Sequence, residues 1–278
     1  SLGSLSMGVG VTTGDNNVAL GYNAAAVLTS GANNVMAGAY AGDALNSGTN
    51  NVGIGYGALG TEDTGGQNVA VGVNALTTLN YDGNGLNTAV GYAAGALMTT
   101  GVQNTLIGGQ AGDALTDGAR NVAVGYLALS TEISGYRNVA IGAEALALTN
   151  GGVYNVAIGD SAGENITTGD NNVIIGGLAG DALTTGSNNV AIGYTALSSA
   201  NGSEGRNVAV GYAALFSLDG DGDGYNTAVG FEAGNAITDG VSNTLIGGLA
   251  GDALTTGSSN IALGTTALTQ SQYGDRNI

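Results

Sequence analysis

The chain of 278 residues contains no Pro, Cys, His or Trp, and its only basic residues are four Arg. Without Cys, a disulfide framework or a thiolate metal site is excluded. Without His and Cys, the Ser-His-Asp and Cys-His catalytic arrangements and histidine-ligated metal sites are excluded as well. Proline would remove a hydrogen-bond donor from a strand that is paired on both sides, so its absence fits a continuous sheet. Only paired carboxylates could perform catalysis, and we expect no enzymatic activity.

Positive charge is also scarce, because 21 acidic residues oppose the four Arg and give a net charge of −17. This balance argues against nucleic acid and anionic membranes as partners. No apolar run approaches the roughly 18 residues of a membrane span, so we expect no membrane insertion of this segment. No signal peptide is visible. The sequence begins and stops in mid-repeat, at "SLGS" and "GDRNI", and is expected to be an excerpt of a longer chain.

Glycine, in contrast, is abundant at 53 residues, and it keeps a fixed register. A phrase of Asn, a β-branched residue, any residue, an aliphatic residue and Gly recurs along the chain. A shorter copy, "SLSMG", stands at residues 4–8. Most intervals are 17 residues, with 19 from Asn68 to Asn87, 18 from Asn189 to Asn207 and 19 from Asn207 to Asn226. Such fixed-period similarity indicates stacked structural repeats. The phrase starts at Asn17, Asn34, Asn51, Asn68, Asn87, Asn104, Asn121, Asn138, Asn155, Asn172, Asn189, Asn207, Asn226, Asn243, Asn260 and Asn277.

The columns of the repeat predict its structure. With the Asn counted as position 0, position +1 is always Val, Thr or Ile, and position +3 is Val, Ile, Leu or, once, Ala37. Position +4 is always Gly and position +7 always Ala in the fifteen complete repeats. A unit of 17 residues has room for short strands and turns but not for a helix with its connections. We therefore predict an all-β fold, a parallel β-solenoid or β-roll of about fifteen 17-residue coils.

A longer period is superimposed on the coils. The segment "AGDAL" recurs at residues 41–45, 111–115, 179–183 and 250–254, which is every four coils, or about every 70 residues. No linker or change of composition interrupts the pattern, so residues 1–278 are predicted to form a single continuous repeat domain. At about 4.8 Å per coil, fifteen intervals would make a rod about 70 Å long.

Two columns predict the interior. Asn tolerates left-handed backbone, and identical amides one coil apart can form a ladder of hydrogen bonds, so the Asn column is predicted to be a structural corner. Position +8 is Leu in some coils, such as Leu59 and Leu129, and Gly or Ala in the others. Where it is small, position +11 is large, as at Leu45, Met98 and Ile166. One large side chain per coil is thus expected to fill the core from either position.

Position +2 carries no polar side chain in any of the fifteen coils. It should point away from positions +1 and +3, so both faces of the strand are expected to be buried. Because a thin coil has one interior, a second and third copy of the chain are expected to cover the other face. The alternative is a strip of small residues on the surface.

The sequences "NVAIG" at 155–159 and 189–193 and "NVAVG" at 121–125 and 207–211 resemble the repeat of YadA-like trimeric autotransporter adhesin heads. They are also similar to repeats of some bacteriophage tail fibres. The resemblance covers almost the whole chain. It implies a left-handed parallel β-roll, three chains around an axis, and a role in surface attachment.

Two loops carry candidate metal ligands. The stretch "DGDGDG" at 219–224 places Asp219, Asp221 and Asp223 in the D-x-D-x-D-G pattern, in which alternating carboxylates converge on Ca²⁺. The other 19-residue coil has "NYDGNG" at 80–85, with Asn80, Asp82 and Asn84 at the same offset. The alternative for both loops is a flexible polar surface turn. No cofactor is expected to be essential.

Aromatic and basic residues also follow the repeat. Position +5 is aromatic in many coils, including Tyr194, Tyr212 and Phe231, which favours packing between coils over a sugar-binding strip. Each Arg directly precedes a corner Asn, which predicts ion pairs at the rim with acids such as Glu132, Glu204 and Asp275.

These features predict a structural segment of an extracellular fibre, either a bacterial cell-surface adhesin or a phage tail fibre. The segment would self-associate as a homotrimer or filament and would display or space a binding function for a cell-surface glycan or protein receptor. The alternatives are a solenoid depolymerase of glycans, which needs an acidic cleft, and an ice- or crystal-binding surface, which needs a regular hydroxyl array.

Overall fold

A computed structural model describes residues 13–199 and 202–278, and the chain divides into two compact units, Ser1–Arg137 and Asn138–Ile278. The short repeat copy at residues 4–8 lies outside the described residues. The described residues form no helix; they contain fifteen strands of three residues each, all in parallel pairs. The all-β prediction is confirmed.

Each strand occupies positions +1 to +3 of its coil. In the first unit the strands are β1 (Val18–Leu20), β2 (Val35–Ala37), β3 (Val52–Ile54), β4 (Val69–Val71), β5 (Thr88–Val90), β6 (Thr105–Ile107) and β7 (Val122–Val124). In the second unit they are β8 (Val139–Ile141), β9 (Val156–Ile158), β10 (Val173–Ile175), β11 (Val190–Ile192), β12 (Val208–Val210), β13 (Thr227–Val229), β14 (Thr244–Ile246) and β15 (Ile261–Leu263).

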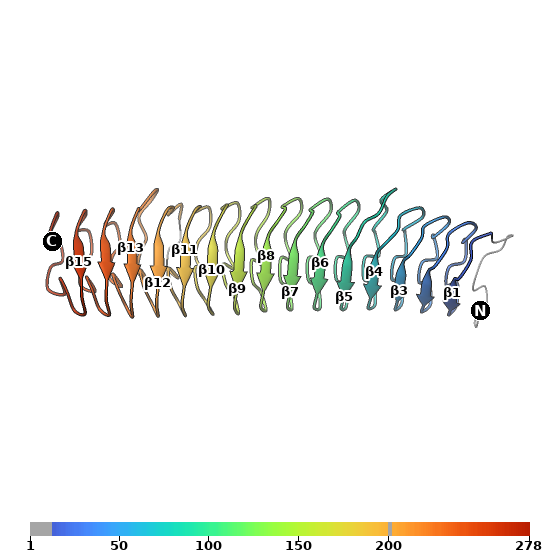
Figure 1. The fold of residues 1–278 in the computed structure, drawn as a ribbon, viewed down its shortest axis with the longest axis horizontal. Helices are drawn as coiled ribbons and strands as arrows, with labels where there is room; N and C mark the ends of the chain where they lie inside the picture. Colours follow the sequence, from blue (N-terminus) through green and yellow to red (C-terminus); the bar gives the residue numbers. More distant parts are fainter. Residues whose placement is uncertain (1–12, 200–201) are drawn as a thin grey trace. The chain divides into compact units, whose positions relative to one another are not determined.

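Within each unit, every strand pairs with the strand of the next coil (Figure 1). The register is position for position, so that Ala19 pairs with Met36 in the first unit and Ala209 with Ala228 in the second. The 19-residue coils keep this register, because their two extra residues loop out before the next corner. The chain is therefore a parallel β-solenoid with a spacing of about 17 residues per turn, as predicted. That residues 1–278 form one continuous domain stays a prediction.

The Asn column forms the predicted ladder. The backbone N–H of Asn172 donates to Asn155 Oδ1 at 3.0 Å, and Asn172 Nδ2 donates to the carbonyl of Gly186 in the next coil at 2.9 Å. Asn172 is fully buried, so these bonds satisfy an amide that has no access to water. The left-handed backbone lies one residue earlier than predicted, as at Asn171 with φ of 58°. The corner turn thus comes before the Asn, whose side chain enters the interior.

The invariant Gly at position +4 has a steric cause. Gly193 has φ of 137°, which residues with a side chain rarely adopt, and a Cβ atom there would overlap the carbonyl oxygen of Gly211 in the next coil. The backbones of successive coils come into direct contact at this column. Any larger residue would force neighbouring coils apart.

The interior confirms the exchange between positions +8 and +11. Leu59 and Leu129 at position +8 are fully buried, as are Leu45, Met98 and Ile166 at position +11. The invariant Ala at position +7 is buried as well, for example Ala145 and Ala196. Some coils bury two large side chains, such as Leu76 with Leu79 and Met36 with Leu45, so the number of large side chains in a core layer varies.

Position +2 is part of this same core, and the prediction that other copies of the chain cover it is wrong. Ala140, Ala157 and Ile174 are fully buried by their own chain. The surface-strip alternative is wrong for the same reason. The strand instead turns positions +1 and +3 outward, where Ile141 is 38% exposed and Ile158 is 36% exposed. The sequence correctly indicated that both faces of the strand are apolar, but it assigned the wrong face to the interior of the coil.

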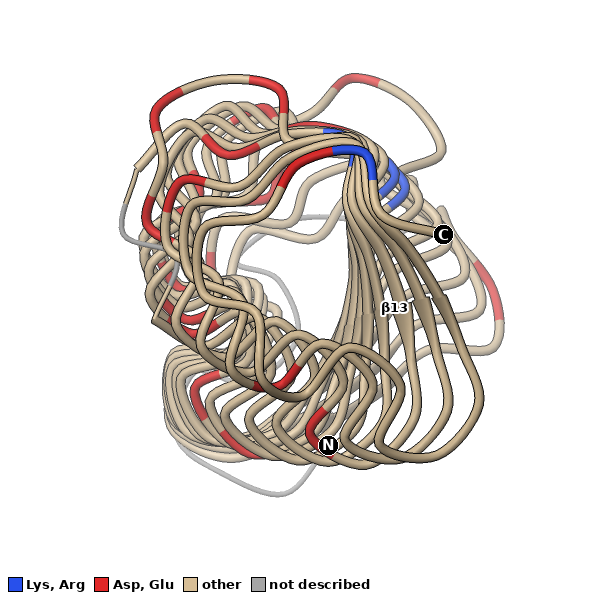
Figure 2. Cartoon of the chain, turned by 90° about the vertical axis from the view of Figure 1, so that its left-hand side faces the viewer, with Lys and Arg blue, Asp and Glu red and all other residues tan. Residues whose placement is uncertain are grey.

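The outward face of the strands lacks charge. Positions +1 and +3 hold only Val, Ile, Leu, Thr or Ala in every coil from β1 to β15. In Figure 2 the strands around β13 carry no acidic or basic residue, whereas acidic residues lie on other parts of the coils. Each unit therefore has an apolar side formed by its strands and more polar sides elsewhere.

Loss of one rung of the ladder should destabilise the fold. Asn155→Ala leaves the N–H of Asn172 and the carbonyl of Gly169 buried without their partners. We expect the free energy of unfolding to fall by about 2–4 kcal/mol, since each such group costs about 1–3 kcal/mol. Urea denaturation of this variant should be compared with Asn150→Ala, which removes an exposed amide. Equal midpoints for the two variants would contradict a stabilising role of the ladder.

Candidate functional site

The loop at residues 219–224 leaves the regular coil between β12 and β13 (Figure 1). It rejoins the stack at a parallel bridge between Asp223 and Gly205. The side chains of Asp219, Asp221 and Asp223 are all exposed. The two Gly residues between them allow the tight path, and Gly222 adopts a φ of 101° with no atom within 4 Å of its missing Cβ.

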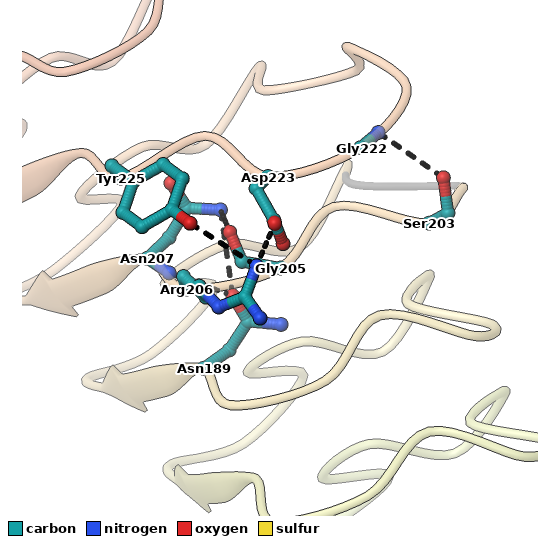
Figure 3. Close-up of polar contacts among 8 residues, drawn as sticks. All are labelled: Asn189, Ser203, Gly205, Arg206, Asn207, Gly222, Asp223 and Tyr225. Carbon is teal, nitrogen blue, oxygen red and sulfur yellow. Dashed lines mark hydrogen bonds and ion pairs between the residues drawn. The ribbon is translucent and has the colours of Figure 1, made fainter.

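Asp223 is engaged by an arginine. Its carboxylate forms an ion pair with Arg206, whose guanidinium also donates to the Tyr225 hydroxyl at 3.2 Å (Figure 3). The guanidinium carbon lies 5.5 Å from the centre of the Tyr225 ring, which adds a cation–π contact. The sequence predicted Glu204 among the partners of the Arg residues, and for Arg206 this is wrong: its partner is Asp223.

Glu204 lies beneath this loop and is almost fully buried, with 1% of its surface exposed. One carboxylate oxygen, Oε2, accepts a hydrogen bond from the Gly202 N–H at 3.0 Å. The other, Oε1, is buried and has no hydrogen-bond partner. Burial raises the pKa of Glu204, and the negative charges of Asp219 and Asp221 raise it further. A buried carboxylate with an unsatisfied oxygen is costly, so this residue calls for a physical explanation.

A cavity of about 120 Å³ lies between the loop and the coils on either side of it. Four acidic residues and no basic residue line it: Glu204, Asp221, Asp223 and Asp239. The remaining wall consists of Leu218, Val241 and loop glycines. The loop therefore encloses a small space that is bordered mainly by negative charge.

The corresponding loop in the first unit is more neutral. Asn80, Asp82 and Asn84 are all exposed, and Asp82 Oδ1 accepts a hydrogen bond from Thr64 Oγ1 at 2.7 Å. Asn84 forms a parallel bridge with Gly66, as Asp223 does with Gly205. Over residues 13–199 and 202–278, no three acidic side chains already stand together in metal-binding geometry. Calcium binding by Asp219, Asp221 and Asp223, or by the Asn80 loop, stays a prediction.

The sequence contains a signal for Glu204 that lies outside the D-x-D-x-D-G motif. The residue three places before the corner Asn is Gly in nearly every coil, for example Gly186 and Gly240. The exceptions along the whole chain are Asn84, Glu204 and Asp223, and all three lie at the lengthened loops. A break in a glycine column thus marks the irregular part of the repeat.

Glu62 is another buried acid, and it occupies the core position +11, where many coils have Leu, Ile or Met and one has the equally buried Glu132. It is fully buried, and its Oε1 accepts a hydrogen bond from the Gly65 N–H at 2.7 Å. Burial raises its pKa to about 7, and the charge of Asp63 adds to this, although hydrogen bonds with the backbone of Gly65 and Tyr81 favour the charged form. Glu62 is therefore largely protonated in the folded chain below neutral pH.

The aromatic residues at position +5 pack on one another, as predicted. The rings of Tyr212 and Phe231 are stacked with centres 5.2 Å apart, and those of Tyr194 and Tyr212 with centres 5.9 Å apart. Each ring is about half exposed. Because the rings face one another, most of the stacking surface that a sugar would need is already occupied.

Glu62 should make stability depend on pH. Its folded pKa of about 7 exceeds its ordinary value of 4.5, so the folded state holds the proton more tightly. Its contribution is fully present below about pH 4.5 and is lost as pH rises through 7, by about 3 kcal/mol. Glu62→Gln, which stays neutral, should therefore gain stability over the native chain as pH rises from 5 to 8. Thermal unfolding across this range checks the prediction, with the exposed Asp117→Asn as control. A difference between Glu62→Gln and the native chain that does not change with pH would refute it.

Comparisons with known proteins assign no family. No protein-family model matches this sequence, and a search of curated proteins finds no match. Within the described ranges, no helix has the length and hydrophobicity needed to cross a bilayer. What can be said of function therefore depends on the geometry described above.

Proposed function

We propose that this chain is a structural segment of an extracellular fibre or adhesin, which associates with further copies of itself and acts as a stiff spacer for attachment or display. The observation that carries this proposal is the uncharged outward face of the strands. The same face is repeated in every coil of both units. A repeated surface of this kind fits a partner that repeats with the same spacing.

The face is apolar enough to require a cover. In the first unit Val18 is 55% exposed and Ile54 and Ile107 are each about 40% exposed, and in the second unit Ile246 is about 40% exposed and Leu263 75%. An apolar surface that continues over the coils of a unit is unusual for a soluble monomer. A second copy offers β-branched residues at the same coil spacing, so its ridges can pack into the grooves of the first.

The assembly that we propose is a homotrimer of left-handed β-rolls, in agreement with the resemblance to YadA-like adhesin heads and to phage tail fibres. Three flat faces can close around one axis with no apolar edge left open. The segment would then belong to a bacterial cell surface or a virion. Its receptor would be a cell-surface glycan or protein, bound by this segment or by the parts of the fibre that it spaces.

We propose a non-catalytic role for the segment. Within the described residues, the acids that line a common cavity are Glu204, Asp221, Asp223 and Asp239, and Asp223 is neutralised by Arg206. The other acids are distributed over the coils of both units. A depolymerase would need two carboxylates facing each other across an open cleft.

Charge introduced on the outward face should dissociate the assembly. The double variant Ile141→Asp and Ile158→Asp would bring like charges together at every interface between copies, and each unpaired buried carboxylate costs several kcal/mol. We expect light scattering to show a trimer for the native chain and a monomer for the variant, with an unchanged circular dichroism spectrum. Leu148→Asp is the control, because Leu148 is equally exposed but lies outside the strands. A native chain that is monomeric at micromolar concentration would contradict the proposal.

A further inference from the structure

The carboxylate of Glu204 is a buried group with an unsatisfied oxygen. It is buried beneath the loop at 219–224, and its Oε1 accepts no hydrogen bond. Both acids lie close to Gly202, where a Cβ atom would be only 3.1 Å from Glu204 Oε1 and 3.3 Å from Asp221 Oδ1. The two carboxylates are therefore near each other, and both border one small cavity.

We propose that this space is a Ca²⁺ site, with Glu204 and Asp221 as its carboxylate ligands. The cavity of about 120 Å³ can hold an ion together with water molecules. Asp239 lies on the wall of the same cavity and adds to its negative charge. Asp223, which the motif alone predicted as a ligand, is instead held by Arg206 at the edge of the cavity.

A bound cation accounts for the unsatisfied oxygen and the clustered negative charge better than a bound water or a protonated Glu204 does. A bound water could donate to Oε1, but it would leave three carboxylates around the cavity with no positive charge among them. Protonation of Glu204 would neutralise one of them and leave Asp221 and Asp239 unpaired. A divalent ion compensates Glu204 and Asp221 together and completes the coordination of the orphan oxygen.

The chemistry of the site favours calcium over magnesium. Ca²⁺ accepts six to eight oxygen ligands at variable angles, and these can include carboxylates, backbone carbonyls and water. The loop offers two carboxylates and a glycine-rich backbone that can move toward the ion. Magnesium requires near-octahedral geometry and dehydrates reluctantly, so a loop that must close around the ion suits it poorly. Because the carboxylates do not already stand together in metal-binding geometry, we expect weak affinity, with Kd of about 10⁻⁴–10⁻³ M.

Calorimetry on the full chain tests the site. Protein freed of metal with a chelator should release or absorb heat in a saturable titration with CaCl₂, and MgCl₂ should bind at least tenfold more weakly. Glu204→Gln and Asp221→Asn should each weaken calcium binding at least tenfold. Glu204→Gln keeps an oxygen for the Gly202 N–H and removes a buried charge, so it should fold without calcium.

Asp117→Asn is the control, because Asp117 is an exposed acid outside both candidate loops. It should leave the calcium titration unchanged. In thermal unfolding, 10 mM CaCl₂ should raise the melting temperature of the native chain and of Asp117→Asn but not that of Glu204→Gln. The proposal is overturned if no calcium heat is seen at 10 mM, or if Glu204→Gln and Asp221→Asn bind calcium as the native chain does. Equal affinity for Mg²⁺ would overturn the assignment to calcium.

Discussion

The fold depends on the requirement that each buried corner amide be satisfied by the next coil. An Asn side chain inside a thin coil has no water to bond with, so its partners must be backbone groups and corner amides of neighbouring coils at a fixed distance. The Asn and Gly columns provide this backbone only if each coil follows the same path as the one before it. The identical spacing of the strands, the direct contact of glycine backbones and the narrow core all follow from this single requirement.

This constraint also explains where variation is allowed. The two 19-residue coils place their extra residues ahead of the corner, and the N–H of Asn226 still donates to Asn207 Oδ1, although Asn207 Nδ2 donates to Gly205 instead of to the following coil. Insertions in the strand would shift the core column by one residue and expose it. Residues in the loops can therefore vary, and can form a binding site, without disturbing the pairing of the coils. Glu204 and its neighbours lie at such a loop.

The sequence alone predicted the period, the strands, the amide ladder and the exchange of Leu between positions +8 and +11, because each is a local rule repeated in every coil. It did not predict which face of the strand is inside. Ala at position +2 and Val at position +1 are both apolar, and hydrophobicity does not distinguish a narrow interior from a surface between chains. The size of the residues was the informative property: small Ala at +2 fits an interior already filled by Leu, whereas Val and Ile at +1 and +3 extend outward.

The candidate site at the loop 219–224 was also predicted only in part. The D-x-D-x-D-G motif led to the right loop, but the pairing of Asp223 with Arg206 depends on two coils lying side by side, which no motif records. The burial of Glu204 likewise depends on the loop that covers it. Only the interruption of the glycine column could have identified Glu204 from the sequence.

The amide ladder has a direction. Toward the coil that follows, a regular corner side chain both donates and accepts, as Asn155 does with Gly169 and Asn172, whereas toward the coil before it only donates, as Asn172 Nδ2 does to Asn155 Oδ1. The two faces of a coil are therefore unequal: the forward face presents an amide that needs a carbonyl and an N–H, and the rear face presents a backbone N–H that needs an acceptor and a Gly carbonyl that needs a donor. A fibre built on this repeat is chemically polar along its axis. An element that terminates the stack must therefore offer different groups at the two ends.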